Sequence, residues 1–522
     1  MKKSQDEQSI WSIDLAPARR GAGANATFVR IAAALVSDIR SGALGAGDKL
    51  PSTRELARRL GVNRNTVVSA FDELSAEGWV VTRGARGTFV CDEVPEKQVR
   101  RVGLPRGMAS RSGFVLRSIR AETDVPSTEV RLAPRDVRYQ LSAGVPDTRL
   151  LPTALLARAY RRALRAPNAS IALDYAEAVG SPRLCSAVAT MLRTTRGIPA
   201  EPENVIITRG SQMALDLVAR ALLRPGDHAL VEELGYRPAW HALAEAGARL
   251  VPVSLDSAGL VVSELESQHE ARCLYVTPHH QYPTTVVLSP ARRSALLAHA
   301  RATGLAIIED DYDHEFHFDG RPVAPLAATD RGAHVIYVGT LSKTLAPGLR
   351  LGFVAAAART IAELAKLRAT SDRQGDHILE NAVAELMEDG ELARHVRKMR
   401  RIYASRRAAL ATAIERDLGD ALSFELPPGG ITLWARVADA IPVDAWQKAA
   451  LARGVAIATA RQFDISGRPA PFVRLAFARH DEAELVDAVR RLRRALADVR
   501  RSAAPRELRE AGFPSTTSSR GA

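Results

Sequence analysis

The residues best suited to covalent chemistry lie in the stretch IYVGTLSKTLAPGLRLGFV, residues 336–354. A β-branched run ends at Gly339, and a short polar loop then places Lys343 seven residues before Arg350. A desolvated lysine has a lowered pKa and a free amine that can act as a nucleophile. A nearby arginine offers a planar fork for a phosphate. The pair suggests a Schiff-base lysine for pyridoxal 5′-phosphate (PLP), with an ordinary solvated loop as the alternative.

Two other apolar runs end in residues that suit the same cofactor. After NVIIT, Gly210, Ser211 and Gln212 open an expected helix, whose free N–H groups would form a phosphate seat. Taken alone, these three residues favour an ordinary capped helix over a phosphate seat. After HALVEE comes Tyr236, which could stack on a flat ring or pack in the core.

A third run, LAIIE, is followed by Asp310 and Tyr312, which project to the same side of an extended chain. A carboxylate facing the ring nitrogen would keep a pyridinium charged and make PLP an electron sink. The tyrosine hydroxyl could bond the oxygen on the ring. Thr340 and Ser342, beside the lysine loop, would add donors to the phosphate.

A metal site is the competing interpretation of the polar residues after this run. The spacing DYDHEFH matches no established ligand pattern, so the sequence favours no metal here. We expect His279 and His280 to line the cofactor pocket instead. The set that a metal site would use is Asp311, Asp313, His314, Glu315 and His317.

The elements that must position these residues alternate β-branched runs with helical patterns from Tyr139 to about Val499. This alternation predicts an α/β fold with a mostly parallel sheet, and ligands in such folds gather at the carboxyl ends of strands. The clearest strands are NVIIT, HALVE, CLYVT, LAIIEDD and HVIYVG.

The N-terminal quarter follows a different pattern. A helix from Thr27 to Gly42 precedes a second helix with a Ser52–Glu55 capping box, and a third helix is capped by Asn63. The run WVVTRGARGTFV, with two glycines, then predicts a hairpin. Three helices followed by a hairpin indicate a winged helix-turn-helix.

In such a module the first turn of the third helix meets base edges, which points to Arg64, Asn65 and Thr66. Arginines on the second helix and at the hairpin tip could meet phosphates. Ordinary surface arginines on a three-helix module, or a protein-binding module, are the alternatives. Those arginines are Arg54, Arg58, Arg83 and Arg86.

Length and charge agree with this division. The 522 residues exceed a single core, and the net charge of +13 favours an anionic partner. Residues 1–140 hold 23 Lys and Arg against 16 Asp and Glu, an excess of 7.

Three scattered cysteines, no signal peptide and no apolar membrane span predict a cytoplasmic protein. The expected parts are an N-terminal arm (1–22), the DNA-binding domain (23–91), a linker (92–138), the PLP-binding domain (139–498) and a disordered tail (499–522).

The stretches LPSTRELARRLGV and NRNTVVSAFDELSAEGW resemble the DNA-binding domain of GntR-type bacterial regulators over residues 27–90. Residues 139–498 resemble the fold-type I aminotransferases, and the joined pair resembles the MocR-type regulators. The resemblance implies DNA contacts from the second and third helices and from the glycine of the wing. These are Arg54, Arg64, Asn65, Thr66 and Gly87.

The same resemblance implies a role for each residue of the body. Lys343 would carry PLP, Asp310 would meet the pyridine nitrogen, Tyr312 the ring oxygen, and Tyr236 would stack on the ring. In PFVRLAFAR, Arg474 aligns with the arginine that clamps an amino acid's α-carboxylate. The residues around the phosphate would be Gly210, Ser211, Gln212, Thr340, Ser342 and Arg350.

Two departures from the aminotransferase pattern stand out. The usual Asn-Pro-Thr-Gly turn reads Tyr-Pro-Thr-Thr here, with Tyr282 and Thr285 at its ends, which puts turnover in doubt more than binding. Arg209 stands where a small residue is usual, and could add charge near the phosphate.

These features predict a regulator that binds duplex DNA and senses PLP, or an amine or amino-acid effector, through PLP on Lys343. The resemblance to the aminotransferase fold further implies a homodimer. The alternatives are a working aminotransferase that carries a DNA-binding head, and a DNA-binding protein whose body is inactive.

Overall fold

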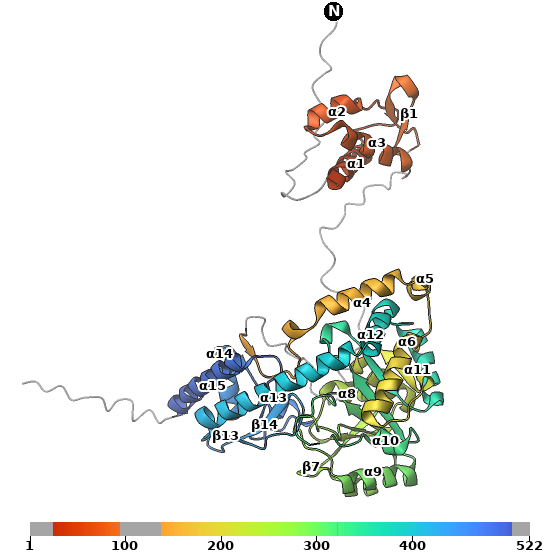
Figure 1. Cartoon of the computed structure of the whole chain (residues 1–522). Helices are drawn as coiled ribbons and strands as arrows, with labels where there is room; N and C mark the ends of the chain where they lie inside the picture. The colour runs from red at the N-terminus through yellow and green to blue at the C-terminus, as the bar shows by residue number, and fades with distance from the viewer. Residues whose placement is uncertain (1–23, 94, 96–136, 321, 504–522) are drawn as a thin grey trace, which may run out of the picture. The chain divides into compact units, whose positions relative to one another are not determined.

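The computed structural model describes residues 24–93, 95, 137–320 and 322–503, which fall into two compact units (Figure 1). The predicted N-terminal arm and nearly all of the predicted linker lie outside the described residues. Within the described ranges, no helix combines the length and the apolar character that crossing a membrane requires.

The N-terminal unit is the predicted winged helix-turn-helix. Helices α1 (Ala24–Ser41), α2 (Thr53–Leu60) and α3 (Arg64–Ala76) precede an antiparallel hairpin of β1 (Val80–Thr82) and β2 (Thr88–Val90). The helices and the hairpin share one apolar core, to which each contributes buried side chains. Among them are Ile31, Leu35, Leu56, Val67, Leu74 and Val90.

The turn between α2 and α3 is fixed by local capping. Ser52 accepts a hydrogen bond from the Glu55 amide at 3.3 Å, whereas the Glu55 carboxylate accepts from Arg59. Gly61 ends α2 at a φ of 64°, and Asn63 caps α3 by accepting from the Asn65 amide at 2.9 Å. Such caps define where each helix starts and stops, so the first turn of α3 has a fixed place in the motif.

The C-terminal unit is built on a seven-stranded sheet of order β4-β12-β11-β10-β9-β5-β6. Neighbouring strands are parallel except where β12 runs antiparallel to β11 and β4. All five strands predicted from the sequence are present. The strands are β4 (Val205–Thr208), β5 (His228–Glu232), β6 (Arg249–Val253), β9 (Ala271–Val276), β10 (Ala306–Asp311), β11 (Val335–Thr340) and β12 (Gly352–Ala355).

Both faces of this sheet are covered by helices, as an α/β fold requires. Ile206 and Ile207 of β4 belong to different apolar clusters, so successive side chains face opposite layers. One layer contains α6 (Pro182–Met191), α9 (Pro290–Thr303), α10 (Leu326–Asp330) and α12 (His377–Glu388). The other contains α7 (Ser211–Leu222), α8 (Arg237–Glu245) and α11 (Ala358–Ser371).

A smaller lobe has its own apolar core and consists mostly of the C-terminal part of the chain, drawn in blue in Figure 1. Its antiparallel sheet has the order β13-β14-β17-β16, and β3 pairs with β15 beside it. The strands are β3 (Tyr139–Gln140), β13 (Leu422–Phe424), β14 (Thr432–Val437), β15 (Val455–Ala456), β16 (Ala458–Thr459) and β17 (Phe472–Ala476). The helices are α13 (Glu391–Leu418), α14 (Val443–Ala452) and α15 (Glu482–Ala503).

Helix α15 corrects the predicted start of the tail at residue 499. The helix runs to Ala503, Val499 is buried, and Arg500 donates to Asp420 at 2.8 Å. The amphipathic pattern therefore continues past the boundary that composition suggested. The unit also contains helix α4 (Thr153–Arg165), the short helix α5 (Ala169–Leu173) and a short hairpin of β7 (Leu255–Asp256) and β8 (Gly259–Leu260).

Candidate functional site

A cavity of about 730 Å³ opens at the carboxyl ends of the parallel strands, where the smaller lobe adjoins the large sheet. Most of the residues predicted for the PLP site line it. They are Ser211, Tyr236, Asp310, Tyr312, Thr340, Ser342, Lys343, Arg350 and Arg474. Gly210 borders the cavity without lining it, and the side chain of Gln212 is exposed on α7.

Lys343 is delivered by the loop that follows β11. Its amine donates a hydrogen bond to the carbonyl oxygen of Gly144 at 2.6 Å. Removal from water, together with the nearby Arg474 cation, lowers the lysine pKa to about 8, against the attraction of Asp313 and Asp310. This is the environment in which a lysine amine is neutral often enough to act as a nucleophile.

Asp310 is the next-to-last residue of β10, and one of its carboxylate oxygens is bonded while the other is free. Tyr275 donates to Oδ2 at 2.8 Å, whereas Oδ1 is buried with no hydrogen-bond partner in the described residues. Desolvation raises the pKa of Asp310 to about 7, and the neighbouring Asp311 charge adds to the shift. A buried acceptor without a donor fits a ring N–H such as that of a pyridinium.

The start of α7 and residue Arg350 form a seat for an anion. The Arg350 guanidinium donates to the Arg209 carbonyl at 2.8 Å and lies against Gly210, where a Cβ would stand 3.1 Å from its carbon Cζ. Gly352 approaches the same turn so closely that a Cβ there would lie 2.8 Å from the carbonyl carbon of Gly210. Helix N–H groups beside a guanidinium suit a phosphate.

Arg209 does not extend this seat. Its guanidinium forms an ion pair with Asp372 at 3.0 Å, and its side chain is largely exposed. The extra charge expected near the phosphate is therefore directed elsewhere, and only the backbone of Arg209 contributes, by holding Arg350.

Arg474 lies in the middle of β17, between β14 and β16, and its side chain is buried. The guanidinium sits 4.5 Å from the centre of the Tyr282 ring and donates a long bond of 3.4 Å to the Ser142 carbonyl. Its Nε has no hydrogen-bond partner among the described residues. A buried cation with so few partners suits a carboxylate ligand.

Tyr282 occupies the centre of the aromatic wall, at the position where aminotransferases usually have asparagine. Its ring makes edge contacts with Tyr236, Tyr312 and Phe463 at centroid distances of 5.4, 5.8 and 5.5 Å. The Tyr312 hydroxyl donates to the His280 carbonyl at 3.0 Å. To donate to a ligand, this hydroxyl would first have to leave that carbonyl.

The expectation that His279 and His280 line the cavity is wrong. Neither belongs to its wall. Both are buried behind Tyr312, where the Asp313 carboxylate lies 2.7 Å from Nδ1 of His280. The chain turns after β9, so Tyr282 rather than the histidines reaches the cavity.

Several wall residues were not expected from the sequence. The segment 142–145 closes the cavity over Lys343, Tyr275 holds Asp310, and Phe463 flanks Tyr282. The small residues of SAGVPD were a usable indication, because a segment without large side chains can approach a ligand closely. Tyr275 gave none, since it lies within an apolar run.

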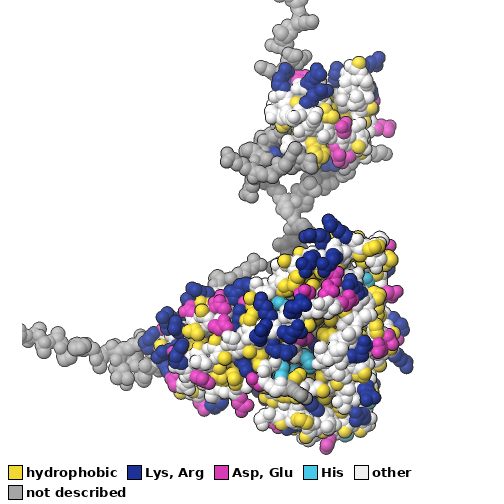
Figure 2. Space-filling model, in the orientation of Figure 1, with side chains coloured by type: hydrophobic (Ala, Val, Ile, Leu, Met, Phe, Trp, Pro, Cys, Tyr) yellow, Lys and Arg dark blue, Asp and Glu magenta, His cyan; other side chains and the backbone are white. Residues whose placement is uncertain are grey.

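In the N-terminal unit, the predicted DNA contacts share one basic region. Arg54, Arg64 and Asn65 are exposed, and Thr66 and Gly87 are partly exposed. Figure 2 shows Lys and Arg side chains gathered over α2 and toward the hairpin, whereas most acidic side chains lie away from them. Gly87 has a φ of 109° in the wing, a conformation that favours glycine.

Comparisons with known proteins agree with both units. Residues 27–90 match the model of the bacterial regulatory proteins of the gntR family, and residues 138–492 match aminotransferase class I and II. The probable rhizopine catabolism regulatory protein MocR of Rhizobium meliloti is 34% identical over 81% of this chain and 84% of its own. The HTH-type transcriptional regulator TauR of Rhodobacter capsulatus is 33% identical over 90% and 96%.

Solved aminotransferases share the fold of the C-terminal unit. The α-aminoadipate aminotransferase LysN of Thermus thermophilus has a TM-score of 0.66 and 28% identity, over 73% of this chain and 97% of its own. The kynurenine aminotransferase of Pyrococcus horikoshii has a TM-score of 0.67 and 27% identity, over 73% and 96%. With a gntR-type head joined to an aminotransferase-like body, and with these regulators as relatives, the chain belongs to the MocR-type transcriptional regulators.

Proposed function

We propose that this regulator holds PLP on Lys343 and uses it to sense PLP itself or an amine or amino acid. One observation carries the proposal: a single cavity contains an amine of lowered pKa, an unpartnered carboxylate oxygen and a buried, poorly paired guanidinium. These belong to Lys343, Asp310 and Arg474. The LysN relative was solved with N-(5′-phosphopyridoxyl)-L-leucine, a cofactor joined to an amino acid.

Each residue has a task that its surroundings support. PLP, when bound, supplies an aldehyde carbon and an electron-accepting ring. Lys343 offers the amine that attaches to it, and Asp310 holds a proton on the ring nitrogen. Arg350 and the first turn of α7, with Ser211, bind the phosphate. Arg474 is left for the carboxylate of an effector.

The output would be a change in DNA binding. An effector can shift the DNA affinity only by binding more tightly to one state of the protein than to another. In this chain, Arg474 is the candidate residue that an amino acid would contact and that PLP alone would not. A relative, PdxR of Corynebacterium glutamicum, is named as a pyridoxine biosynthesis transcriptional regulator, which supports PLP itself as an alternative signal.

We further propose a homodimer, supported by an apolar surface on and beside α5. Ile171, Leu173 and Tyr175 are 68%, 66% and 76% exposed, and Leu164 is also exposed near the end of α4. Large apolar side chains gathered within twelve residues are typical of a protein interface. A second copy of the chain would cover them.

A working aminotransferase is the second candidate, favoured by the complete set of Lys343, Asp310 and Arg474 in one cavity. Lys343 could move a proton as well as carry the cofactor. The ring of Tyr282 in the place of asparagine argues against efficient turnover. Steady-state assays with amino-acid and keto-acid pairs distinguish the two candidates, since many turnovers per chain would contradict a pure sensor.

The deciding experiment follows PLP and DNA together. Full-length protein is loaded with PLP, reduced with borohydride and digested, and mass spectrometry locates the modified peptide. We expect PLP on Lys343 and amine-dependent changes in both its visible absorption and DNA binding. PLP attached to another residue, or none attached at all, would refute the assignment.

A further inference from the structure

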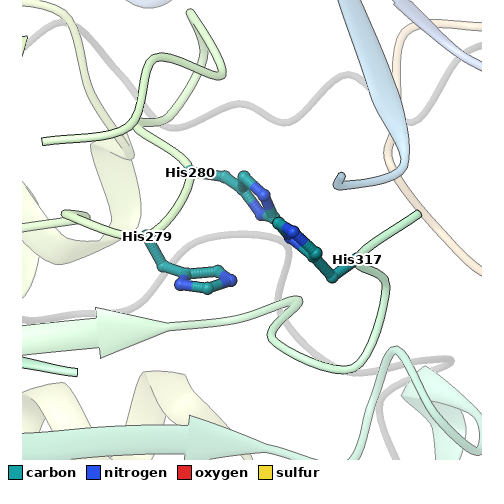
Figure 3. Close-up of side chains that lie close together, drawn as sticks. All are labelled: His279, His280 and His317. Atoms are coloured by element: carbon teal, nitrogen blue, oxygen red, sulfur yellow. The ribbon is translucent and has the colours of Figure 1, made fainter. Parts of the chain in front are cut away.

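Behind the cavity wall, three histidines from two neighbouring loops converge. His279 and His280 follow β9, and His317 follows β10, the strand that pairs with β9 in parallel. One nitrogen from each of the three rings lies within 4.8 Å of the others. Figure 3 shows the rings of His280 and His317 pointing toward each other, with His279 alongside. None of the three lines the cofactor cavity.

The nitrogens of this group lack partners. Both ring nitrogens of His279 and Nε2 of His280 are buried with no hydrogen-bond partner in the described residues, and the residues are 4% and 1% exposed. His317 also has none, although the Asp319 backbone lies near its ring without good hydrogen-bond geometry. An unsatisfied buried polar group is unfavourable, so several in one place call for a ligand.

We propose that His279, His280 and His317 bind a transition-metal cation of the Zn²⁺ type. Three imidazoles with one open position are a common set of zinc ligands, and imidazole also suits copper, nickel and cobalt. The cation would accept lone pairs from nitrogens that have no other partner. His317 is partly exposed, although both of its ring nitrogens are buried.

The surroundings supply the orientation that such a site needs. The Asp313 carboxylate lies 2.7 Å from Nδ1 of His280, which leaves Nε2 to face the other histidines. Metal-binding histidines are typically held in this way by a carboxylate on the second nitrogen. Asp311 and Asp313 favour positive charge here, and Arg293 and Arg400 oppose it.

The glycine at position 429 keeps space beside the group. Gly429 forms an isolated antiparallel β-bridge with His317. A Cβ on Gly429 would lie 2.6 Å from Nε2 of His280. A side chain at this position would therefore fill the approach to the unpartnered nitrogen.

A second grouping, His279 with Asp311 and His314, is less suited to a cation. Only one oxygen of Asp311 is free, because Nδ1 of His314 lies 2.9 Å from Oδ2 and Tyr337 donates to that same oxygen at 2.7 Å, whereas Oδ1 has no partner among the described residues. Bonds between the candidate ligands themselves leave this set fewer free atoms than the three histidines.

The test uses the untagged full-length chain, stripped of metal with a chelator and titrated with Co²⁺. Visible bands of cobalt bound to nitrogen ligands report the site directly, and Zn²⁺ should abolish them in competition. We expect about one cation per chain. Wild-type protein that shows no such bands, or binds no Zn²⁺ against a chromophoric chelator, would overturn the proposal without any variant.

Variants locate the site. His279→Asn and His317→Asn should each weaken binding by more than the about 10- to 100-fold that loss of an orienting carboxylate typically causes. His269→Asn changes an exposed histidine elsewhere and should bind as the wild type does. Thermal melts identify any variant that fails to fold. Wild-type affinity in both ligand variants, or loss in His314→Asn with retention in His317→Asn, would contradict the assignment.

Discussion

At the scale of single residues, the lowered pKa of Lys343 predicts how the rate of PLP attachment depends on pH. Its pKa of about 8 means that the amine is mostly charged below that pH and mostly neutral above it. The rate at which PLP attaches to the cofactor-free protein should rise about tenfold per pH unit below pH 8 and level off above it. Stopped-flow absorbance measures the rate, and continued increase up to pH 10 would indicate an unshifted lysine.

The same shift has a consequence for stability. The folded state lowers the lysine pKa from 10.5, so between about pH 8 and 10.5 the unfolded chain binds more protons than the folded one. Burial of the charged lysine therefore lowers the free energy of unfolding by its full amount below pH 8, and this destabilisation disappears as the pH rises toward 10.5. Lys343→Met should remove that pH dependence.

Asp310 should show opposite effects on stability and on binding. Burial raises its pKa to about 7, so its charge destabilises the cofactor-free fold increasingly as the pH rises above the unfolded value. Asp310→Asn should then melt at the same temperature or higher at pH 8. It should also weaken PLP binding by about 10- to 100-fold, because a hydrogen bond to a charged group is lost.

Tyr275→Phe is the matched control for this prediction. It removes the donor to Oδ2 and keeps the Asp310 carboxyl group with its free Oδ1, so its effect on PLP affinity should be smaller. Equilibrium titration and thermal melts measure both variants. A fall in melting temperature for Asp310→Asn with unchanged PLP binding would show that the carboxylate serves the fold instead.

At the scale of elements, the close approach of β12 to the start of α7 sets the phosphate seat. In Gly352→Ala the new Cβ would lie 2.8 Å from the Gly210 backbone, so the turn must move. We expect a loss of about 1–3 kcal/mol in stability and a weaker affinity for PLP. Gly348→Ala, only four residues away, meets nothing within 4 Å and should leave both unchanged.

The exposed side chain of Arg64 in the first turn of α3 predicts a change in DNA binding when it is removed. Arg64 is exposed and contacts Thr53 only through a long bond of 3.5 Å, so Arg64→Ala should leave the fold intact. If it reads a base, specificity at one position should relax by about 1–3 kcal/mol; if it meets a phosphate, the salt dependence should fall by about one unit. Arg59→Ala, whose guanidinium pairs with Glu55, is the control. Unchanged DNA binding by Arg64→Ala in titrations over a range of salt concentrations would exclude this contact.

The sequence predicted the elements that depend on local pattern. The parallel strands are β-branched runs, and the helix-turn-helix follows from Ser52, Gly61 and Asn63, each of which acts on its near neighbours. The cavity depends on long-range contacts that spacing does not reveal. Ser142 meets Arg474 across more than three hundred residues, and the turn after β9 decides that Tyr282 and not His279 faces the ligand.

At the scale of the whole molecule, the apolar surface at α5 predicts how two copies meet. Leu173→Asp places a charge in the proposed interface and should convert the dimer to monomer at micromolar concentration, as measured by analytical ultracentrifugation. Leu426→Asp changes another exposed leucine, in a different part of the fold, and should stay dimeric. Identical sedimentation of both variants would place the interface elsewhere.

The hydrogen bond from Lys343 to Gly144 gives two tasks to one amine. The amine holds the segment 142–145, near the start of the C-terminal unit in sequence, and the same amine is the one offered to PLP. An amine bonded to PLP can no longer make the same hydrogen bond to Gly144, so we expect the segment 142–145 to be held less firmly when PLP is attached. Amide hydrogen exchange in this short stretch should then report whether the site is filled.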